Sequence, residues 1–428
     1  MIDTNDWIAE LLHSQAASFT HEKSENAMIE NLKNSGLAFP TDADYRNRIE
    51  RAQASMKRSG IDVLAISGFD YLRFFTGLNG LPVGRPIWLV LLQDGAPAFV
   101  SPRSEAKEIR ARCNTPVAME WVEWEEPVPA PMTHHAALAK YVADIAPTAR
   151  TIGVDFNSTW ALNIELVEQA LGAERVKDAT VMLRELLARK DAVAIDVIRR
   201  CTDIVAHQFA ACRELVAPGV PEWKVALASL TAGTERAAQW WNGNEEQSPF
   251  VQGMQMMGAG RERTARCHSA GGGRKMREGE ILQVCFCGPS FFGHAIGYDR
   301  PFHIGLKPLP ADLRKVVDVA REAQEAALAK VGPGALAGEV HAAAVAVIER
   351  QGWKSPFLHR TGRGIGYSDW DGIELKANSP TVLEPGMVLT VEPAPYVDGI
   401  GGARFGDTVL VTETGYEVLT PFDLGRDI

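Results

Sequence analysis

The strongest constraint on the fold is a change of pattern near residue 190. Before it, short apolar runs alternate with amphipathic segments, as in "IDVLAIS", "EAKEIRARC", "TIGVDF" and "LNIELVEQALG". Such alternation is typical of an α/β unit. After it, "DAVAIDVIRRCTDIVAHQFAACRELV" carries apolar residues at helical spacing until Pro218 and Gly219 stop the pattern. The 428 residues therefore predict two domains of different architecture.

The second part of the chain predicts helices on an antiparallel sheet. Strand candidates at "EILQVCFC" and "FFGHAIGY" precede helical segments at "ADLRKVVDVAREAQEAALAKV" and "AGEVHAAAVAVIERQ", and the end is rich in strands. We expect an α/β domain over 41–188 and an α+β domain over 189–428. Residues 1–40 have the pattern of a polar helical extension, whose role the sequence does not assign. The Met-rich stretch "FVQGMQMMGAG" is expected to be a loop.

Charge and composition narrow the class of protein. The formal net charge is −10 and the basic residues are dispersed, which argues against nucleic acid or an anionic membrane as partner. No apolar run reaches the ~20 residues of a membrane span, and the N-terminus lacks a secretion-signal pattern. The six cysteines are scattered, which favours reduced thiols in a cytoplasm. We expect a cytoplasmic protein.

The stretch "HRTGRGIGYSDWD" over 359–371 has the composition of a binding site. Glycines allow a close approach of the backbone, and Arg363 lies among them. A second unusual feature is the C-x-C pair Cys285 and Cys287. No further Cys/His pair at a zinc-type spacing accompanies it, and "ILQVCFCG" has the pattern of a buried strand, so buried thiols are favoured over zinc ligands.

The string "VLEPGMVLTVEPAPYVDGIGGARFGDTVLVTETGYEVLT" closely resembles the last strands of the creatinase/prolidase/methionine-aminopeptidase family, whose fold is called pita-bread. The stretches "REGEIL", "CRELVAPGVPEWKVA" and "YLRFFTG" resemble further parts of the same family. The resemblance covers most of 41–428. It implies a creatinase-like N-terminal α/β domain followed by a pita-bread catalytic domain.

In the peptidases of this family, two Asp, one His and two Glu hold two metal ions that polarise a carbonyl and activate water. Carried over by position, these ligands correspond here to Cys285, Gly297, Arg363, Glu392 and Gly406. Only Glu392 is retained, and the arginine would bring a fixed cation to the place of a dication, which is electrostatically unfavourable. We therefore expect no metal and no other cofactor, although a thiol at position 285 could keep some affinity for metal.

The metal-independent branch of the family is typified by creatinase, which hydrolyses a C–N bond with a histidine and carboxylates. The resemblance aligns His268 with the catalytic histidine, and Glu392 and Asp299 with the carboxylates. We expect the imidazole, with an ordinary pKa near ~6.5, to act as general acid and base. The two carboxylates would orient the scissile group and stabilise positive charge.

Four further residues are candidates for binding substrate. Arg363 would bind a substrate carboxylate or stabilise an oxyanion. Arg85 coincides with an arginine that in creatinase reaches into the partner subunit's site, which implies a homodimer. His359 lies in the same loop as Arg363 and is expected to line the pocket; the alternative is a structural hydrogen bond to the backbone. Trp370 aligns with a further histidine of the peptidases. Arg404, in "GARFGD", is interpreted as a structural ion-pair former.

The function expected from these residues is a metal-independent, creatinase-like hydrolase. It would cleave a C–N bond, amidine or amide, in a small nitrogenous substrate that bears a carboxylate. Creatinase has histidines at the positions of Arg363 and Gly406, so the pocket is not expected to fit creatine. Two alternatives stay open: an Xaa-Pro-type aminopeptidase or dipeptidase, and a pita-bread protein that binds a ligand without catalysis.

Overall fold

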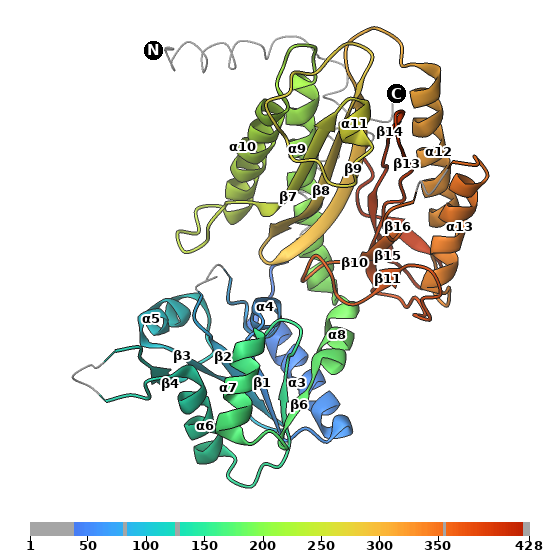
Figure 1. The fold of residues 1–428 in the computed structure, drawn as a ribbon. Helices are drawn as coiled ribbons and strands as arrows, with labels where there is room; N and C mark the ends of the chain where they lie inside the picture. Colours follow the sequence, from blue (N-terminus) through green and yellow to red (C-terminus); the bar gives the residue numbers. More distant parts are fainter. Residues whose placement is uncertain (1–37, 80–83, 125–128, 354–356, 423–428) are drawn as a thin grey trace, which may run out of the picture. The chain divides into compact units, whose positions relative to one another are not determined.

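A computed structural model describes residues 38–79, 84–124, 129–353 and 357–422 of the chain (Figure 1). The extension expected over 1–40 lies, up to residue 37, outside the described residues. None of the helices in the described part combines the length and the apolar character that a membrane crossing requires.

The N-terminal domain is an α/β unit built on one six-stranded sheet of order β4-β3-β2-β1-β5-β6. Its strands are β1 (Val63–Ile66), β2 (Trp88–Leu92), β3 (Ala98–Pro102), β4 (Val117–Trp121), β5 (Ile152–Val154) and β6 (Val176–Asp178). Its helices are α3 (Asp42–Ser59), α4 (Phe69–Thr76), α5 (Arg103–Arg112), α6 (His134–Ile145), α7 (Ala161–Leu171) and α8 (Thr180–Ala188). All four residues of β1 are buried, as its uninterrupted apolar run requires of a central strand.

Local signals set the boundaries of α3. The Thr41 amide and hydroxyl both donate to the carboxylate of Asp44, which closes the start of the helix. Gly60 ends the helix in a left-handed conformation with φ 65°. The helix also contacts the second domain, because the buried Arg48 pairs with Asp191 at 2.8 Å. Asp191 is the N-cap residue of the first helix of that domain.

The C-terminal domain has helices around antiparallel strands. The helices are α9 (Ala192–Leu215), α10 (Glu222–Trp241), α11 (Arg261–Thr264), α12 (Ala311–Leu328) and α13 (Ala337–Glu349). One sheet has the order β7-β8-β9, with β7 (Gln252–Ala259), β8 (Ile281–Phe291) and β9 (His294–His303). A second has the order β11-β10-β12-β15-β16, with β10 (Gly362–Gly364), β11 (Glu374–Leu375), β12 (Val388–Val391), β15 (Asp407–Val411) and β16 (Tyr416–Val418).

These sheets lie between two pairs of helices. In Figure 1 the strands have α9 and α10 on one side and α12 and α13 on the other. A short pair, β13 (Tyr396–Val397) and β14 (Gly401–Gly402), completes the domain. The expected α/β and α+β domains are confirmed. The expectation of a loop at "FVQGMQMMGAG" is wrong, because this stretch forms β7 and pairs with β8.

Candidate active site

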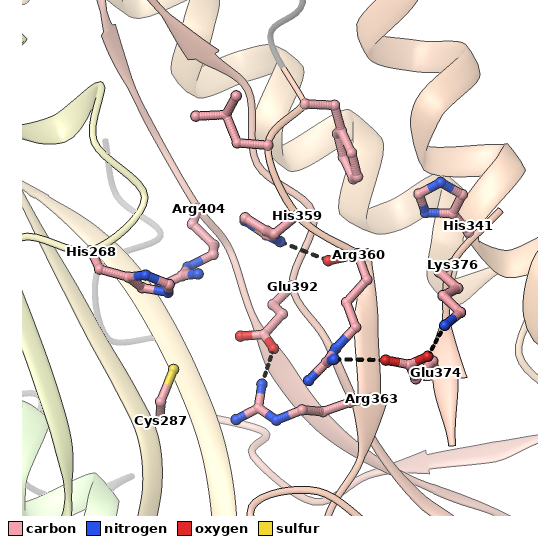
Figure 2. A pocket seen from close by; sticks show the side chains of 12 residues that line it. His268, Cys287, His341, His359, Arg360, Arg363, Glu374, Lys376, Glu392 and Arg404 are labelled. Atoms are coloured by element: carbon pink, nitrogen blue, oxygen red, sulfur yellow. Dashed lines mark hydrogen bonds and ion pairs between the residues drawn. The ribbon is translucent and has the colours of Figure 1, made fainter. Parts of the chain in front are cut away.

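A cavity of about 640 Å³ opens in the C-terminal domain. The side chains around it come from helix α13, from strands β8, β10 and β11, from the segments that precede β8, β10 and β15, and from those that follow β11 and β12 (Figure 2). The titratable side chains among them include those of His268, Cys287, His359, Arg363, Glu392 and Arg404. Sequence positions more than a hundred residues apart therefore meet in one cavity.

Arg363 is fixed by its strand and by two side-chain contacts. It lies on β10 directly opposite Thr390 of β12. Its Nη1 donates to Glu392 Oε1 at 2.5 Å, and its Nε donates to the backbone oxygen of Asp369 at 2.5 Å. Burial alone would lower the pKa of Arg363, but Glu392 and Cys287 outweigh burial and raise it. The guanidinium is thus a permanent charge in the cavity wall.

The glycines beside Arg363 serve close packing within the protein. A Cβ at Gly362 would lie 1.9 Å from the backbone oxygen of Thr390. A Cβ at Gly364 would lie 1.8 Å from the carboxylate of Asp371. Both positions therefore exclude any side chain, and the glycine-rich pattern follows from the pairing of β10 with its neighbours.

Glu392 follows β12 and is almost fully buried. Burial would raise the pKa of this carboxyl group, but the charges of Arg363 and Arg404 outweigh burial and lower it to about 2. Thr390 also donates its hydroxyl to Glu392 Oε1 at 3.0 Å. The side chain is therefore a carboxylate at every physiological pH.

Arg404 lines the cavity, a role that the sequence analysis did not assign to it. Gln283 of β8 holds its backbone from both sides, accepting from the Arg404 amide at 2.8 Å and donating to its carbonyl at 3.0 Å. The Nε of Arg404 lies 3.5 Å from Asp299 Oδ1, and its Nη2 donates to the thiol of Cys285. The sequence analysis noted Arg404 within "GARFGD", but no local pattern in the sequence predicts that its side chain lines the cavity.

Asp299 lies on β9, opposite Cys285 of β8, and is fully buried. A Cβ at Gly406 would lie 2.0 Å from its Oδ2 and 3.0 Å from the Cβ of Glu392. The carboxyl group thus fills the room that a side chain at position 406 would need. Burial raises the pKa of Asp299 well above its ordinary value, while Arg404 acts in the opposite direction.

The adjacent Arg300 does not pair with the Asp299 carboxyl group. Its Nη2 donates to Asp407 Oδ1 at 2.7 Å, and its Nη1 donates to the backbone oxygens of Asp299 and Gly406 at 2.8 Å each. Asp299 itself is not among the described residues that line the cavity, but its carboxyl group lies next to Arg404, which does line it, and it also acts on the charge of Glu392.

His268 follows α11 and is exposed on the cavity wall. Figure 2 shows its ring beside the guanidinium of Arg404. Burial and the charge of Arg404 lower the pKa of His268, and Glu392 opposes them. At neutral pH the imidazole is neutral and can accept a proton.

Three further residues were predicted to bind substrate: His359, Trp370 and Arg85. His359 lines the cavity, and its Nδ1 faces the backbone oxygen of Arg360 at 2.6 Å while Nε2 faces the Tyr396 hydroxyl at 2.9 Å. Burial lowers its pKa to about 4. The guanidinium carbon of Arg184 lies over Trp370, 4.2 Å from the centre of the tryptophan ring.

Arg85 pairs with Glu123 of the same domain at 2.7 Å. Neither Arg85 nor Trp370 is among the described residues that line the cavity. The binding roles of both stay predictions.

No group of three or more His, Cys, Asp or Glu side chains suited to a metal ion occurs within the described ranges. Of the five family positions, Cys285 and Glu392 alone carry groups that could ligate a metal. Each of them accepts a hydrogen bond from an arginine, Arg404 and Arg363 respectively.

Comparison with known families and proteins agrees with this architecture. The model of metallopeptidase family M24 matches residues 196–413, and that of the creatinase/prolidase N-terminal domain matches residues 48–186. An agropine synthesis cyclase of Rhizobium rhizogenes is 65% identical over 390 residues, covering 91% of this chain and 98% of the relative. A "Probable dipeptidase PepE" of Mycobacterium bovis is 30% identical, covering 87% of this chain and 93% of that protein.

Solved structures show the same fold. The dipeptidase PepE of Mycobacterium ulcerans has a TM-score of 0.75 and 27% identity, covering 90% of this chain and 98% of its own. An Xaa-Pro dipeptidase of Bacillus anthracis has a TM-score of 0.74 and 21% identity, covering 88% and 98%. These findings confirm the expected family and the pita-bread fold.

Proposed function

Because the chain belongs to metallopeptidase family M24 and carries the N-terminal domain of creatinases and prolidases, we propose that it closes a ring within a small, nitrogenous substrate that bears a carboxylate. One observation carries this proposal: the chain is 65% identical to an agropine synthesis cyclase over 98% of that relative's length. A hydrolase-type family supplies the framework, and the ring-closing reaction is the specialisation that we infer.

Ring closure and hydrolysis use the same elementary steps. In both, a group X–H attacks an acyl or amidine carbon, the C–X bond forms, the bond to the leaving group Y breaks, and the proton of X ends on Y. In hydrolysis X–H is water, whereas in ring closure it is a hydroxyl or amine of the same substrate. An internal nucleophile held in place has a high effective concentration, so it competes well with water.

His268 is the proposed carrier of that proton. Its lowered pKa keeps the imidazole neutral at physiological pH, as a general base requires. After attack, the imidazolium gives the proton to the departing nitrogen or oxygen. Glu392 fixes the Arg363 guanidinium at 2.5 Å and supplies the negative charge that favours the imidazolium.

The arginines are the proposed electrophilic groups. Arg363 and Arg404 place two permanent positive charges on the cavity wall. A substrate carboxylate, or the oxyanion that develops during attack on a carbonyl, would be stabilised by either. This assignment gives Arg404 a role in binding alongside the predicted one of Arg363.

We propose that the reaction needs no metal. The family's two ions would have to share Cys285 and Glu392, which already accept hydrogen bonds from guanidinium groups, while glycines at 297 and 406 offer no side-chain donor. A dication would also lie within a few ångströms of two fixed cations, which costs several kcal/mol at an effective dielectric constant of about 20. The donor set therefore does not fit the two-metal site, and no step is assigned to a metal.

We also propose that the enzyme is a homodimer in which Arg85 reaches the partner's site. The resemblance to creatinase supports this, and Arg85 is not among the described residues that line the cavity of its own chain. Its exposed pair with Glu123 is of the kind that contributes little to stability, about 0–1 kcal/mol, and would exchange readily for a substrate carboxylate.

The direct test is a ring-closure assay with carboxylate-bearing amino-acid derivatives, read by the mass of the product. Ring closure lowers the mass by one water or one ammonia, whereas hydrolysis gives two fragments or adds one water. His268→Ala should fold normally and lose ~10²–10⁴-fold in rate. The control His303→Ala, at the far end of β9, should retain the activity.

Hydrolysis of a dipeptide is the second candidate, favoured by the similarity to the PepE dipeptidases. The same assay separates the two functions. Cleavage of dipeptides that depends on added transition metal, with no ring closure on any substrate, would contradict the proposed function.

A further inference from the structure

Cys287 lies in the wall of the cavity and has no role in the mechanism described so far. It is on β8, two residues after Cys285, and the two sulfur atoms are 3.5 Å apart. Figure 2 shows its thiol pointing into the cavity on the side where His268 and Arg404 lie. A thiol in this position can reach a substrate that also contacts the imidazole.

The surroundings of Cys287 favour a thiolate. The positive charge of the Arg363 guanidinium, which lines the same cavity, favours the ionised sulfur. Arg404 contributes a second positive charge, and it also donates to the neighbouring Cys285. The hydrogen bond from Cys285 outweighs burial and, with these arginines, lowers the pKa of Cys287 to about 7. By contrast, burial raises the pKa of Cys201 to about 12.

The other side chains around the cavity leave little competition for a nucleophilic role. Among the described residues that line it, Cys287 is the sole thiol, and none carries a hydroxyl group. The two carboxylates, Glu374 and Glu392, are each held in an ion pair with a cationic side chain. Cys285 is fully buried and cannot reach a substrate.

We propose that Cys287 is the covalent nucleophile of the ring closure. This inference rests on the proposed function and extends it to a two-step reaction. The neutral imidazole of His268 takes the proton of the Cys287 thiol as the sulfur attacks the acyl carbon and the C–S bond forms. The bond to the leaving group then breaks, and the leaving group takes that proton from the imidazolium. In the second step the internal hydroxyl or amine attacks the thioester and gives its proton to the imidazole, the C–S bond breaks, and the imidazolium returns the proton to the departing sulfur.

The thioester gives the cyclisation a physical advantage. The substrate stays tethered in the cavity between the two steps, so its own nucleophile remains next to the acyl carbon. A guanidinium beside the sulfur stabilises the thiolate both before attack and on release. The charge is conserved through the cycle, and no oxidant or metal enters.

The test compares wild type, Cys287→Ala and Cys287→Ser with the control Cys113→Ser, whose thiol lies in the N-terminal domain. We expect both position-287 variants to lose at least ~100-fold in kcat, and the control to retain its activity. Acid-quenched wild type, mixed with substrate, should show a peptide containing residue 287 heavier by the acyl part of the substrate. A Cys287→Ala variant with wild-type kcat would overturn the inference.

A second measurement does not depend on the ring-closing activity. p-Nitrophenyl acetate should release a burst of one p-nitrophenol per chain and leave an acetyl group on Cys287, while Cys287→Ala gives no burst. A burst in an enzyme that closes no ring would refute the proposed function and support the nucleophile. Ring closure by wild type without any burst or adduct would support the function and refute the nucleophile.

Discussion

Two guanidinium groups, those of Arg363 and Arg404, lie at the site and contact different partners. The first donates to Glu392, and the second donates to Cys285 and faces Asp299. Unit charges 4 Å apart interact by about 4 kcal/mol at an effective dielectric constant of 20, so each arginine changes the proton affinity of its neighbours. The chemistry of the site at a given pH follows from these charges.

The first prediction concerns the pH dependence of kcat/KM. The pKa of His268 is lowered, so the acidic limb of the profile should have its midpoint below the ordinary ~6.5. Arg404→Gln removes a charge that lowers this pKa and should move the midpoint upward. Glu392→Gln removes a charge that raises it and should move the midpoint downward. Shifts of both variants in the same direction would refute the assignment of His268 as the titrating base.

A second prediction concerns the charge of Arg363. Arg363→Met keeps much of the side-chain volume but removes the cation, and kcat/KM for a carboxylate-bearing substrate should fall by about 10²–10³-fold. Arg363→Lys should recover only part of this loss, because an ammonium cannot make the two parallel hydrogen bonds of a guanidinium. Steady-state kinetics on the two variants decide the matter. Unchanged kinetics in the Met variant would refute a binding or catalytic role.

At the scale of the elements, the pairing of β8 with β9 and its contact with the segment before β15 shape the site. Asp299 pairs across to Cys285 on one side and forms a bridge to Gly406 on the other. The carboxyl group of Asp299 therefore lies in the space that a side chain at position 406 would need.

The third prediction tests whether the Asp299 carboxyl group occupies the space that a side chain at position 406 would need. Gly406→Ala should destabilise the protein by about 1–3 kcal/mol, because its Cβ would meet Asp299 Oδ2 at 2.0 Å. Asp299→Ala should remove most of that cost, so the two substitutions should be non-additive in the free energy of unfolding. Gly415→Ala is the control, since nothing lies within 4 Å of a Cβ there. Additive effects in chemical denaturation would show that the two positions do not contact.

A fourth prediction concerns the buried pair of β9 and β15. Asp407→Asn would leave the fully buried Arg300 without its carboxylate partner and should cost about 3–5 kcal/mol of unfolding free energy. Glu322→Gln breaks an ion pair whose side chains are more than half exposed, and should change stability by less than about 0.5 kcal/mol. Equal effects of the two substitutions would contradict the buried placement of Arg300.

The sequence predicted most elements because their apolar patterns match their burial. The run at β1 and the helical spacing of α9 are examples. It did not predict β7, because glycine and methionine have weak strand preferences and the pairing comes from β8. It also gives no sign that the partner of Arg300 is Asp407, more than a hundred residues away. Contacts across such distances are invisible to local patterns.

At the scale of the whole molecule, the site of one chain lacks any contribution from its N-terminal domain among the described lining residues. If Arg85 completes the partner's site, a fifth prediction follows. Arg85→Ala and His268→Ala should each be inactive alone. Unfolded, mixed in equal amounts and refolded, they should recover about a quarter of wild-type activity, because half the dimers are mixed and each carries one intact site. No recovery in a mixture shown to contain mixed dimers would contradict a shared site.

The central claim is that fixed arginine charges and a proton-carrying imidazole do the work that two metal ions do in related peptidases. The most direct test is turnover by enzyme dialysed against chelator, with the metal content of the same sample measured by elemental analysis. The account predicts full turnover at far less than one metal ion per chain. Loss of turnover on removal of tightly bound manganese, cobalt, iron or zinc, and its recovery on adding the metal back, would contradict it.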